Sequence, residues 1–139
     1  MKTTGAIGNG AECFAQVLRS ITFNNDGLVP TIAQQFDTGE VLMMAWMNRD
    51  AIKETLKTGH VCYWSRSQVR LWRKGENSGQ IQTLKDFRWD CDADTVLLQV
   101  DQAGVACHTG RRNCFFNAVR DGEPAVISEV MIDPSELYE

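Results

Sequence analysis

Residues 80–100 read QIQTLKDFRWDCDADTVLLQV, two strand-like segments, 80–89 and 95–100, on either side of a run of alternating acids. Apolar segments of this length, rich in branched and aromatic residues, are typical of β-strands. The same strand signal recurs between Gly-, Asn- and Asp-rich turns, at 61–67, 69–74, 105–109, 113–119 and 125–132. Strands joined by such short turns predict a mostly antiparallel sheet.

The amino-terminal half adds one clear helix, expected at 48–59. Asn48 is a suitable N-cap, Asp50 complements the dipole in the first turn, and Gly59 is a suitable C′ residue. The face expected to pack on the sheet contains Ala51, Ile52, Thr55 and Leu56.

Other local signals complete the expected fold. Strands at 28–36 and 41–47 are expected to be joined by a hairpin turn at 37–40, with a short helix at 11–20 and a last helical turn at 134–139. The whole pattern predicts an α+β fold, with a mostly antiparallel, curled or barrel-like sheet capped by one main helix.

Composition sets the broad class. The chain has 139 residues, enough for one domain, and we expect residues 1–10 to be flexible. The net charge of −4, from 14 basic against 18 acidic residues, does not favour binding to nucleic acid or to an anionic membrane. The longest apolar run, 41–47, is too short to span a bilayer, and the amino terminus lacks the apolar core of a secretory signal. We therefore expect a cytoplasmic protein.

Five cysteines without paired spacing argue against a disulfide framework. Cys13 and Cys62 lie in apolar segments, so we expect both in the core. His60 follows the predicted helix end, where a cation complements the helix dipole, and we expect a structural role for it.

Asp90, Asp92 and Asp94 place three carboxylates at alternate positions, with Cys91 between the first two. In a straight strand the outer two aspartates would lie about 13 Å apart along one face. One cation reaches all three only if the backbone bends, and a site of oxygen donors favours Mg²⁺ or Ca²⁺. An EF-hand would need Gly where Thr95 stands. A solvated acidic turn is an equal alternative.

The segment ACHTGRRNCFF, residues 106–116, gathers two cysteines and one histidine around a Gly turn. Cys91, Cys107 and Cys114 lack the paired spacing of a zinc ribbon, but three thiolates could hold Zn²⁺ and leave a fourth position for water. His108 would then be a general base, or a fourth ligand that closes the site.

The segment YWSRSQVRLWRKGENSGQ, residues 63–80, is basic and contains a Gly- and Ser-rich loop. Backbone amides of such a loop, together with Arg and Lys side chains, form a phosphate cradle, and tryptophans can stack on a base. The loop lacks the final GKS or GKT of a Walker motif. By itself the segment is better described as a basic two-stranded hairpin.

Taken together, the motifs AWMNRDAI, YWSRS, LWRKGENSGQ, WDCDAD and ACHTGRRNCFF resemble the phosphoribosyl-AMP cyclohydrolase family of histidine biosynthesis. In order and spacing they cover about residues 43–116, more than half the chain. The family's loop usually has Thr or Ser where this chain has Asn77, and its thiol segment has Ser where this chain has Asn113. Both changes keep a polar side chain.

The resemblance implies an intertwined homodimer whose subunits jointly build each active site, with one Zn²⁺ and one Mg²⁺ per subunit. The implied zinc ligands are Cys91 from one subunit and, from the other, Cys107 and Cys114. The implied magnesium ligands are Asp90, Asp92 and Asp94. The residues implied to bind substrate are Ser65, Arg66, Ser67, Trp72, Lys74, Gly75, Glu76, Ser78 and Gly79. Residues 1–139 would form one domain of this family without a fused pyrophosphohydrolase domain.

The implied reaction is hydrolysis of the N1–C6 bond in the adenine ring of 1-(5-phosphoribosyl)-AMP, which gives the formimino-aminoimidazole carboxamide ribonucleotide. Attack at C6 needs a hydroxide at neutral pH, and zinc with three protein ligands supplies a zinc-bound hydroxide. His108 is expected to take or relay the proton. Arg66, Lys74 and the 75–79 loop are expected to hold phosphate.

Two other functions stay open from the residues alone. A non-catalytic, zinc-stabilised binding module would close its metal site with three cysteines and His108. A nucleobase deaminase would need the H-x-E…P-C-x-x-C signature, but no Glu stands two residues after His60 or His108.

Overall fold

The computed structural model describes residues 10–137, so the expected flexible segment 1–10 lies, apart from Gly10, outside the described residues. The elements along the chain are α1 (Ala11–Ser20), β1 (Val29–Gln35), β2 (Val41–Met47), α2 (Arg49–Thr58), β3 (Cys62–Ser65), β4 (Arg70–Arg73), β5 (Gln82–Trp89), β6 (Val96–Gln102), β7 (Asn117–Arg120), β8 (Glu123–Val126) and α3 (Pro134–Leu137). Among these residues no helix is long and apolar enough to cross a membrane.

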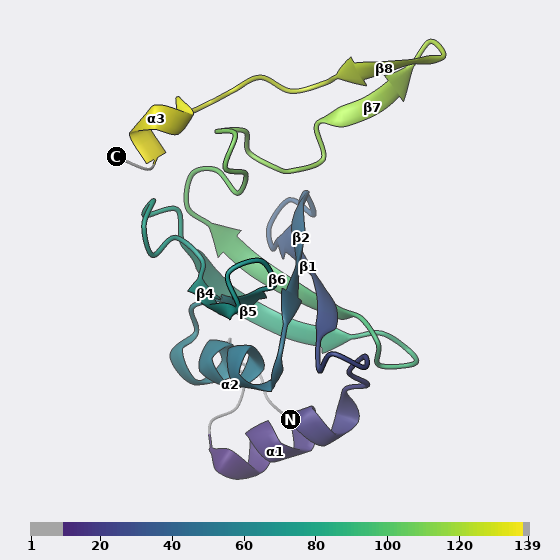
Figure 1. Cartoon of the computed structure of the whole chain (residues 1–139), viewed down its shortest axis with the longest axis vertical. Coiled ribbons are helices and arrows are strands. Elements are labelled where there is room, and N and C mark those ends of the chain that lie inside the picture. Colours follow the sequence, from purple (N-terminus) through teal and green to yellow (C-terminus); the bar gives the residue numbers. More distant parts are fainter. Residues whose placement is uncertain (1–9, 138–139) are drawn as a thin grey trace.

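Six strands form one sheet in the order β4-β3-β2-β1-β6-β5, and β7 pairs with β8 in a separate hairpin. The six-stranded sheet curls into a half-barrel, which confirms the predicted α+β class (Figure 1). Neighbouring strands in it are antiparallel except β1 and β6, which run parallel from Thr31 opposite Val96 to Gln35 opposite Val100. The sheet is therefore mixed, and its parallel pair joins the amino-terminal strands to the later ones.

Helix α2 forms as its sequence predicts. The Asn48 side chain accepts a hydrogen bond from the Ala51 backbone N–H at 2.8 Å, and Gly59 ends the helix in the left-handed conformation at φ 77°. The buried face is the predicted one and consists of Ala51, Ile52, Thr55 and Leu56.

Helix α1 also forms over its predicted residues, and both helices lie at one end of the molecule below the sheet (Figure 1). Phe14, Val17 and Leu18 of α1 pack on the core cluster that includes Ile52 and Leu56 of α2. The apolar stripe of each helix is therefore covered by the same core as the sheet.

Three predicted strands are wrong or too long. Residues 105–109 form a turn, because the Gly110 N–H donates to the Cys107 carbonyl at 3.0 Å and the chain doubles back there. The segment 113–119 becomes strand only at Asn117, and 125–132 stops being strand after Val126. An apolar run becomes a strand only where a second strand completes its hydrogen bonds, and the sequence pattern does not supply that partner.

The β7–β8 hairpin, residues 117–126, projects away from the helices and the sheet, and we call it the arm (Figure 1). After the arm the chain returns to the body, where the Met131 and Ile132 N–H groups donate to the Gly110 carbonyl at 2.8 and 3.1 Å. The arm and the strand-free segment after it expose several large apolar side chains, namely Val119, Val126, Ile127, Val130 and Met131.

Candidate active site

The acidic turn, residues 90–95, joins β5 to β6 and bends sharply. The Ala93 N–H donates to the Asp90 carbonyl at 3.0 Å, and Ala93 itself lies at a positive φ of 64°. Thr22, after α1, donates its backbone N–H to the Ala93 carbonyl at 2.8 Å and so ties the turn to the segment that follows α1. The bend that a single cation requires is therefore present.

The bend brings three exposed carboxylates together: one oxygen from each of Asp90, Asp92 and Asp94 lies within 4.8 Å of the others. Although desolvation of its carboxylate opposes it, hydrogen bonds from Asp94 hold the pKa of Asp90 below its usual range. A hydrogen bond with Asp92, desolvation and repulsion from both neighbours raise the pKa of Asp94. This mutual repulsion among oxygen donors fits a divalent hard cation.

The thiol turn, residues 106–114, brings two predicted zinc ligands together. Desolvation of its sulfur, followed by the charge of Cys107 and a hydrogen bond with it, raises the pKa of Cys114 to about 12, and Lys74 opposes the rise. The Thr109 hydroxyl donates to the Cys107 Sγ at 3.0 Å. Two neighbouring thiolates repel each other unless a cation lies between them. Sulfur donors favour a soft divalent cation, so this pair fits such an ion.

Cys91 does not join this pair within one chain. It is exposed in the acidic turn, whereas Cys107 is buried in the thiol turn. Over residues 10–137, the one group of three or more potential metal ligands that lie within reach of each other is the aspartate group. A single chain therefore does not close a four-ligand site from the three cysteines and His108.

His108 and Cys114 share a cavity of about 260 Å³ with Trp72 and Lys74, and its wall is completed by Met43, Met44, Ala45 and Ala106. His108 itself is exposed. The structure thus places the predicted acid–base residue beside one predicted zinc ligand and two predicted substrate-binding residues.

Lys74 is buried, and its Nζ donates to the Ala106 carbonyl at 2.7 Å. Its Nζ also lies 5.3 Å from the centroid of the Trp72 ring. Burial lowers the pKa of Lys74, while the nearby Cys114 and Cys107 thiols act in the opposite direction. The amine thus lies within electrostatic range of both thiols.

The other predicted substrate-binding residues lie around β3 and β4. Ser65 ends β3, the exposed Arg66 places its guanidinium 4.7 Å from the Trp46 ring centroid, and the Ser67 hydroxyl lies 3.5 Å from that of Ser65. These side chains present hydroxyl and guanidinium donors at one end of the hairpin, which suits an anionic ligand.

The loop 75–79 closes on itself, since the Gly79 N–H donates to the Gly75 carbonyl at 2.8 Å. A Cβ on Gly75 would lie 2.6 Å from the Ile81 nitrogen, so glycine is required there. Glu76 forms an ion pair with Arg70, and the Ser78 hydroxyl accepts from the Gln80 N–H at 3.2 Å. The carboxylate of Glu76 is thus already engaged within the hairpin.

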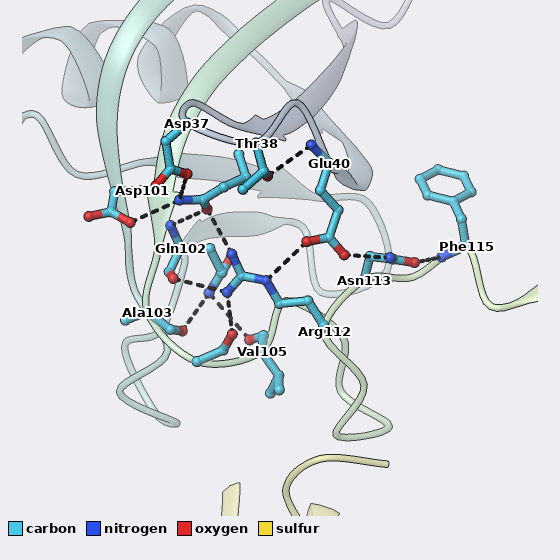
Figure 2. Close-up of polar contacts among 12 residues, drawn as sticks. Asp37, Thr38, Glu40, Asp101, Gln102, Ala103, Val105, Arg112, Asn113 and Phe115 are labelled. Atoms are coloured by element: carbon cyan, nitrogen blue, oxygen red, sulfur yellow. Dashed lines mark hydrogen bonds and ion pairs between the residues drawn. The ribbon is translucent and has the colours of Figure 1, made fainter. Parts of the chain in front are cut away.

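Sequence reasoning missed the polar residues behind the thiol turn, which Figure 2 shows. Arg112 connects Glu40 to the ends of β1 and β6, and Asn113 donates to the same Glu40. Arg112 and Asn113 belong to the quoted motif, but no local signal marks Glu40, which lies 72 residues earlier than Arg112.

Comparisons with known proteins point to one family. The family model described as phosphoribosyl-AMP cyclohydrolase matches residues 43–116, more than half the chain. The phosphoribosyl-AMP cyclohydrolase of Rhodospirillum centenum is 68% identical over 85% of this chain and 89% of its own length. That of Rhodospirillum rubrum is 60% identical over 99% of this chain and 94% of its own length.

Proposed function

The chain belongs to the phosphoribosyl-AMP cyclohydrolase family, whose members are hydrolases of histidine biosynthesis, and from this premise we propose how it opens its substrate. The substrate is 1-(5-phosphoribosyl)-AMP, and the bond that breaks is N1–C6 of the adenine ring. The observation that carries the proposal is the single cavity lined by His108, Cys114, Lys74 and Trp72. A cytoplasmic location stays a prediction.

Zinc is the group that the thiols would hold. Cys107 and Cys114 would supply two sulfur donors from the thiol turn, and Cys91 of a second copy of the chain would supply the third. A zinc ion with three protein ligands supplies a water whose pKa is lowered towards 7, and so a nucleophile at neutral pH. Three ligands from protein, rather than four, distinguish this catalytic site from a closed structural one.

His108 moves the proton in this scheme. Water adds its oxygen to C6 and the C6–N1 bond breaks. One water proton ends on N1, which becomes the phosphoribosyl-bearing nitrogen of the formimino group, and the other ends on the C6 imino nitrogen, which becomes the carboxamide nitrogen. An imidazole beside the thiol pair can accept the proton that the water loses and return it to N1. Trp72, in the wall of the same cavity, offers a ring face for the adenine.

Charged groups near the cavity would hold the rest of the substrate. Arg66 and Ser67 offer exposed donors for a phosphate, the half-buried Ser65 offers another, and the backbone of the 75–79 loop offers amides. Lys74 contributes positive charge from within, beside the thiols. Mg²⁺ on Asp90, Asp92 and Asp94 would neutralise a phosphate or orient the ribose.

The subunits would share the zinc site in a homodimer. Two features support this: Cys91 is exposed and apart from the thiol pair of its own chain, and the arm exposes apolar side chains such as Val119, 72% exposed. A second copy that covers the arm would remove this surface from water and could bring its own Cys91 to the pair.

The experiment that tests the reaction incubates the purified protein with 1-(5-phosphoribosyl)-AMP, Zn²⁺ and Mg²⁺ and follows ring opening by ultraviolet absorbance. Cys107→Ala should lose bound zinc and activity together, while Cys13→Ala, a thiol substitution on α1, should retain both. Full activity in a zinc-free Cys107→Ala protein would refute the zinc mechanism. A deaminase would instead release ammonia without opening the ring.

A second experiment separates the role of His108 from that of a ligand. We expect His108→Ala to retain zinc while turnover falls by about 10²–10⁴-fold, the usual cost of a lost acid–base group. Release of zinc by this variant would make His108 a ligand, as in the binding-module alternative. X-ray absorption should show three sulfur ligands and one water in the wild type.

A third experiment tests sharing between subunits. Cys91→Ala and Cys107→Ala proteins are each expected to be inactive, but heterodimers made from both contain one site with all three thiols. Mixing under dissociating conditions should restore part of the activity. Heterodimers that form, as shown by two different affinity tags, yet stay inactive would contradict the shared site.

A further inference from the structure

The thiol turn has no helix or strand between Ala106 and Cys114, so other contacts must set where its two sulfurs lie. Three backbone hydrogen bonds close the turn on itself: the Ala106, Cys107 and Gly110 N–H groups donate to the Arg112, Arg111 and Cys107 carbonyls at 2.9, 3.2 and 3.0 Å. One backbone hydrogen bond reaches the sheet, from the Cys114 N–H to the Leu42 carbonyl of β2 at 2.8 Å. Each backbone residue that is not held in place loses conformational entropy when it becomes ordered around a ligand.

Arg112 supplies the missing connection. Its guanidinium donates to the Gln102 carbonyl at 3.1 Å, to the Gly104 carbonyl, and to the Gln35 side-chain oxygen at 2.9 Å. Gln35 is the last residue of β1, Gln102 is the last residue of β6, and Gly104 follows β6; β1 and β6 are the parallel pair of the sheet. One planar side chain in the thiol turn is thereby tied to the buried Gln35 and Gln102 at the ends of these two strands.

Glu40 completes the arrangement from the turn before β2. Its Oε1 accepts from Arg112 Nε at 3.3 Å, and its Oε2 accepts from Asn113 Nδ2 at 2.8 Å (Figure 2). Asn113 then accepts from the Phe115 N–H at 2.8 Å with its own Oδ1. Cys114 is therefore flanked on both sides by residues that the Glu40 system holds.

We propose that Glu40, acting through Arg112 and Asn113, is a positioning residue that presets the two thiols of this turn for metal binding. We call the three residues the clamp. The inference rests on the proposed zinc site, but it concerns residues that contact neither metal nor substrate. Residues that orient metal ligands from behind typically change metal affinity or activity 10–100-fold when they are substituted.

The test measures binding of Zn²⁺ alone, by competition with a chromophoric chelator, in the full-length protein. Glu40→Gln should weaken zinc binding 10–100-fold, because an amide cannot accept from both Arg112 and Asn113. Asp86→Asn is the matched control: it also removes one carboxylate from an ion pair, that with Arg88 on β5, at 2.7 Å, and should leave zinc affinity unchanged.

Substitution with Co²⁺ adds a spectroscopic readout. Thiolate-to-cobalt charge-transfer and d–d bands report sulfur geometry, and they should weaken or shift in Glu40→Gln but not in Asp86→Asn. If Glu40→Gln does not fold, Asn113→Ala removes one clamp hydrogen bond at a half-buried site, and about tenfold weaker zinc binding is expected.

The outcomes distinguish failure of the clamp from failure of the proposed zinc site. Wild-type zinc affinity and an unchanged cobalt spectrum in Glu40→Gln, or in Asn113→Ala, would overturn the clamp while the zinc site stands. A wild-type protein that does not bind zinc, or a Cys107→Ala protein that binds it as tightly, would overturn the proposed zinc site and the clamp with it.

Discussion

Gly110 is the point at which the thiol turn meets the C-terminal segment, and Gly110→Ala tests whether that junction supports the fold. Gly110 has a φ of 86°, and its carbonyl accepts from both the Met131 and Ile132 N–H groups. A Cβ there would overlap the Ile132 carbonyl oxygen. An alanine must therefore adopt a left-handed conformation and also displace the segment 131–132.

The two costs can be separated with a second glycine. The left-handed conformation alone costs an L-residue roughly 1–2 kcal/mol. Displacing 131–132 removes two backbone hydrogen bonds of about 1 kcal/mol each, so Gly110→Ala should cost about 3–4 kcal/mol in unfolding free energy. Gly27 has a similar φ of 75° with no atom within 4 Å of the added Cβ, so Gly27→Ala should cost only the first part.

The assay is urea unfolding of the metal-free protein, followed by tryptophan fluorescence at one fixed protein concentration, since self-association would alter the apparent stability. The informative quantity is the difference between the two variants, about 2 kcal/mol. Variants that agree within 0.5 kcal/mol would refute the reasoning, because the junction at Gly110 would then contribute nothing beyond its backbone conformation.

Two further predictions concern the core. Tyr63 is fully buried, and its hydroxyl donates to Gln82 Oε1 at 2.8 Å. Tyr63→Phe leaves this buried acceptor unpaired and should lower the free energy of unfolding, measured with urea, by about 1–3 kcal/mol. An unchanged midpoint and slope of the urea transition would contradict this. Burial of the Cys62 thiol, and to a smaller extent the negative charge of Glu54, raises its pKa from 9.0 to about 12. The neutral thiol is therefore favoured in the fold, stability is intact below pH 9, and it falls as pH rises towards 12. The unfolding free energy lost through this thiol by pH 10 is about 1.4 kcal/mol, so the difference between wild type and Cys62→Ala should shrink by that amount from pH 8 to pH 10; a constant difference would contradict it.

The acidic turn shows which features of the site can be predicted from neighbouring residues. Alternating acids defined the donors, and strand geometry defined the condition that the chain must bend for one cation to reach Asp90, Asp92 and Asp94. Hydrogen bonds within the turn form the bend, and Thr22, about 70 residues earlier, attaches the turn to the segment after α1 by donating its N–H to the Ala93 carbonyl. A contact between distant segments cannot be predicted from the spacing of neighbours.

The thiol turn shows a strand prediction that failed. Residues 105–109 have the composition of a strand, and the cysteines on either side of the Gly turn are predicted zinc ligands because of the family resemblance, whereas residue type alone leaves other roles open. The structure keeps Cys107 and Cys114 together but replaces the strand with a turn, because Arg112 carries the hydrogen bonds to the sheet that a strand backbone would have made. Glu40, which supports that arginine, carries no local signal of its own.

The sequence by itself determined helix α2 with both its caps, the alternating strands, and the identities of the thiol, carboxylate and imidazole groups, because each depends on residues within one or two turns of the chain. Tertiary structure alone decided that β1 pairs in parallel with β6, that Thr22 holds the acidic turn, and that Glu40 meets Arg112. Side-chain alternation defines which face of a strand is buried but not which strand lies beside it, so the neighbours that position the site follow only from packing.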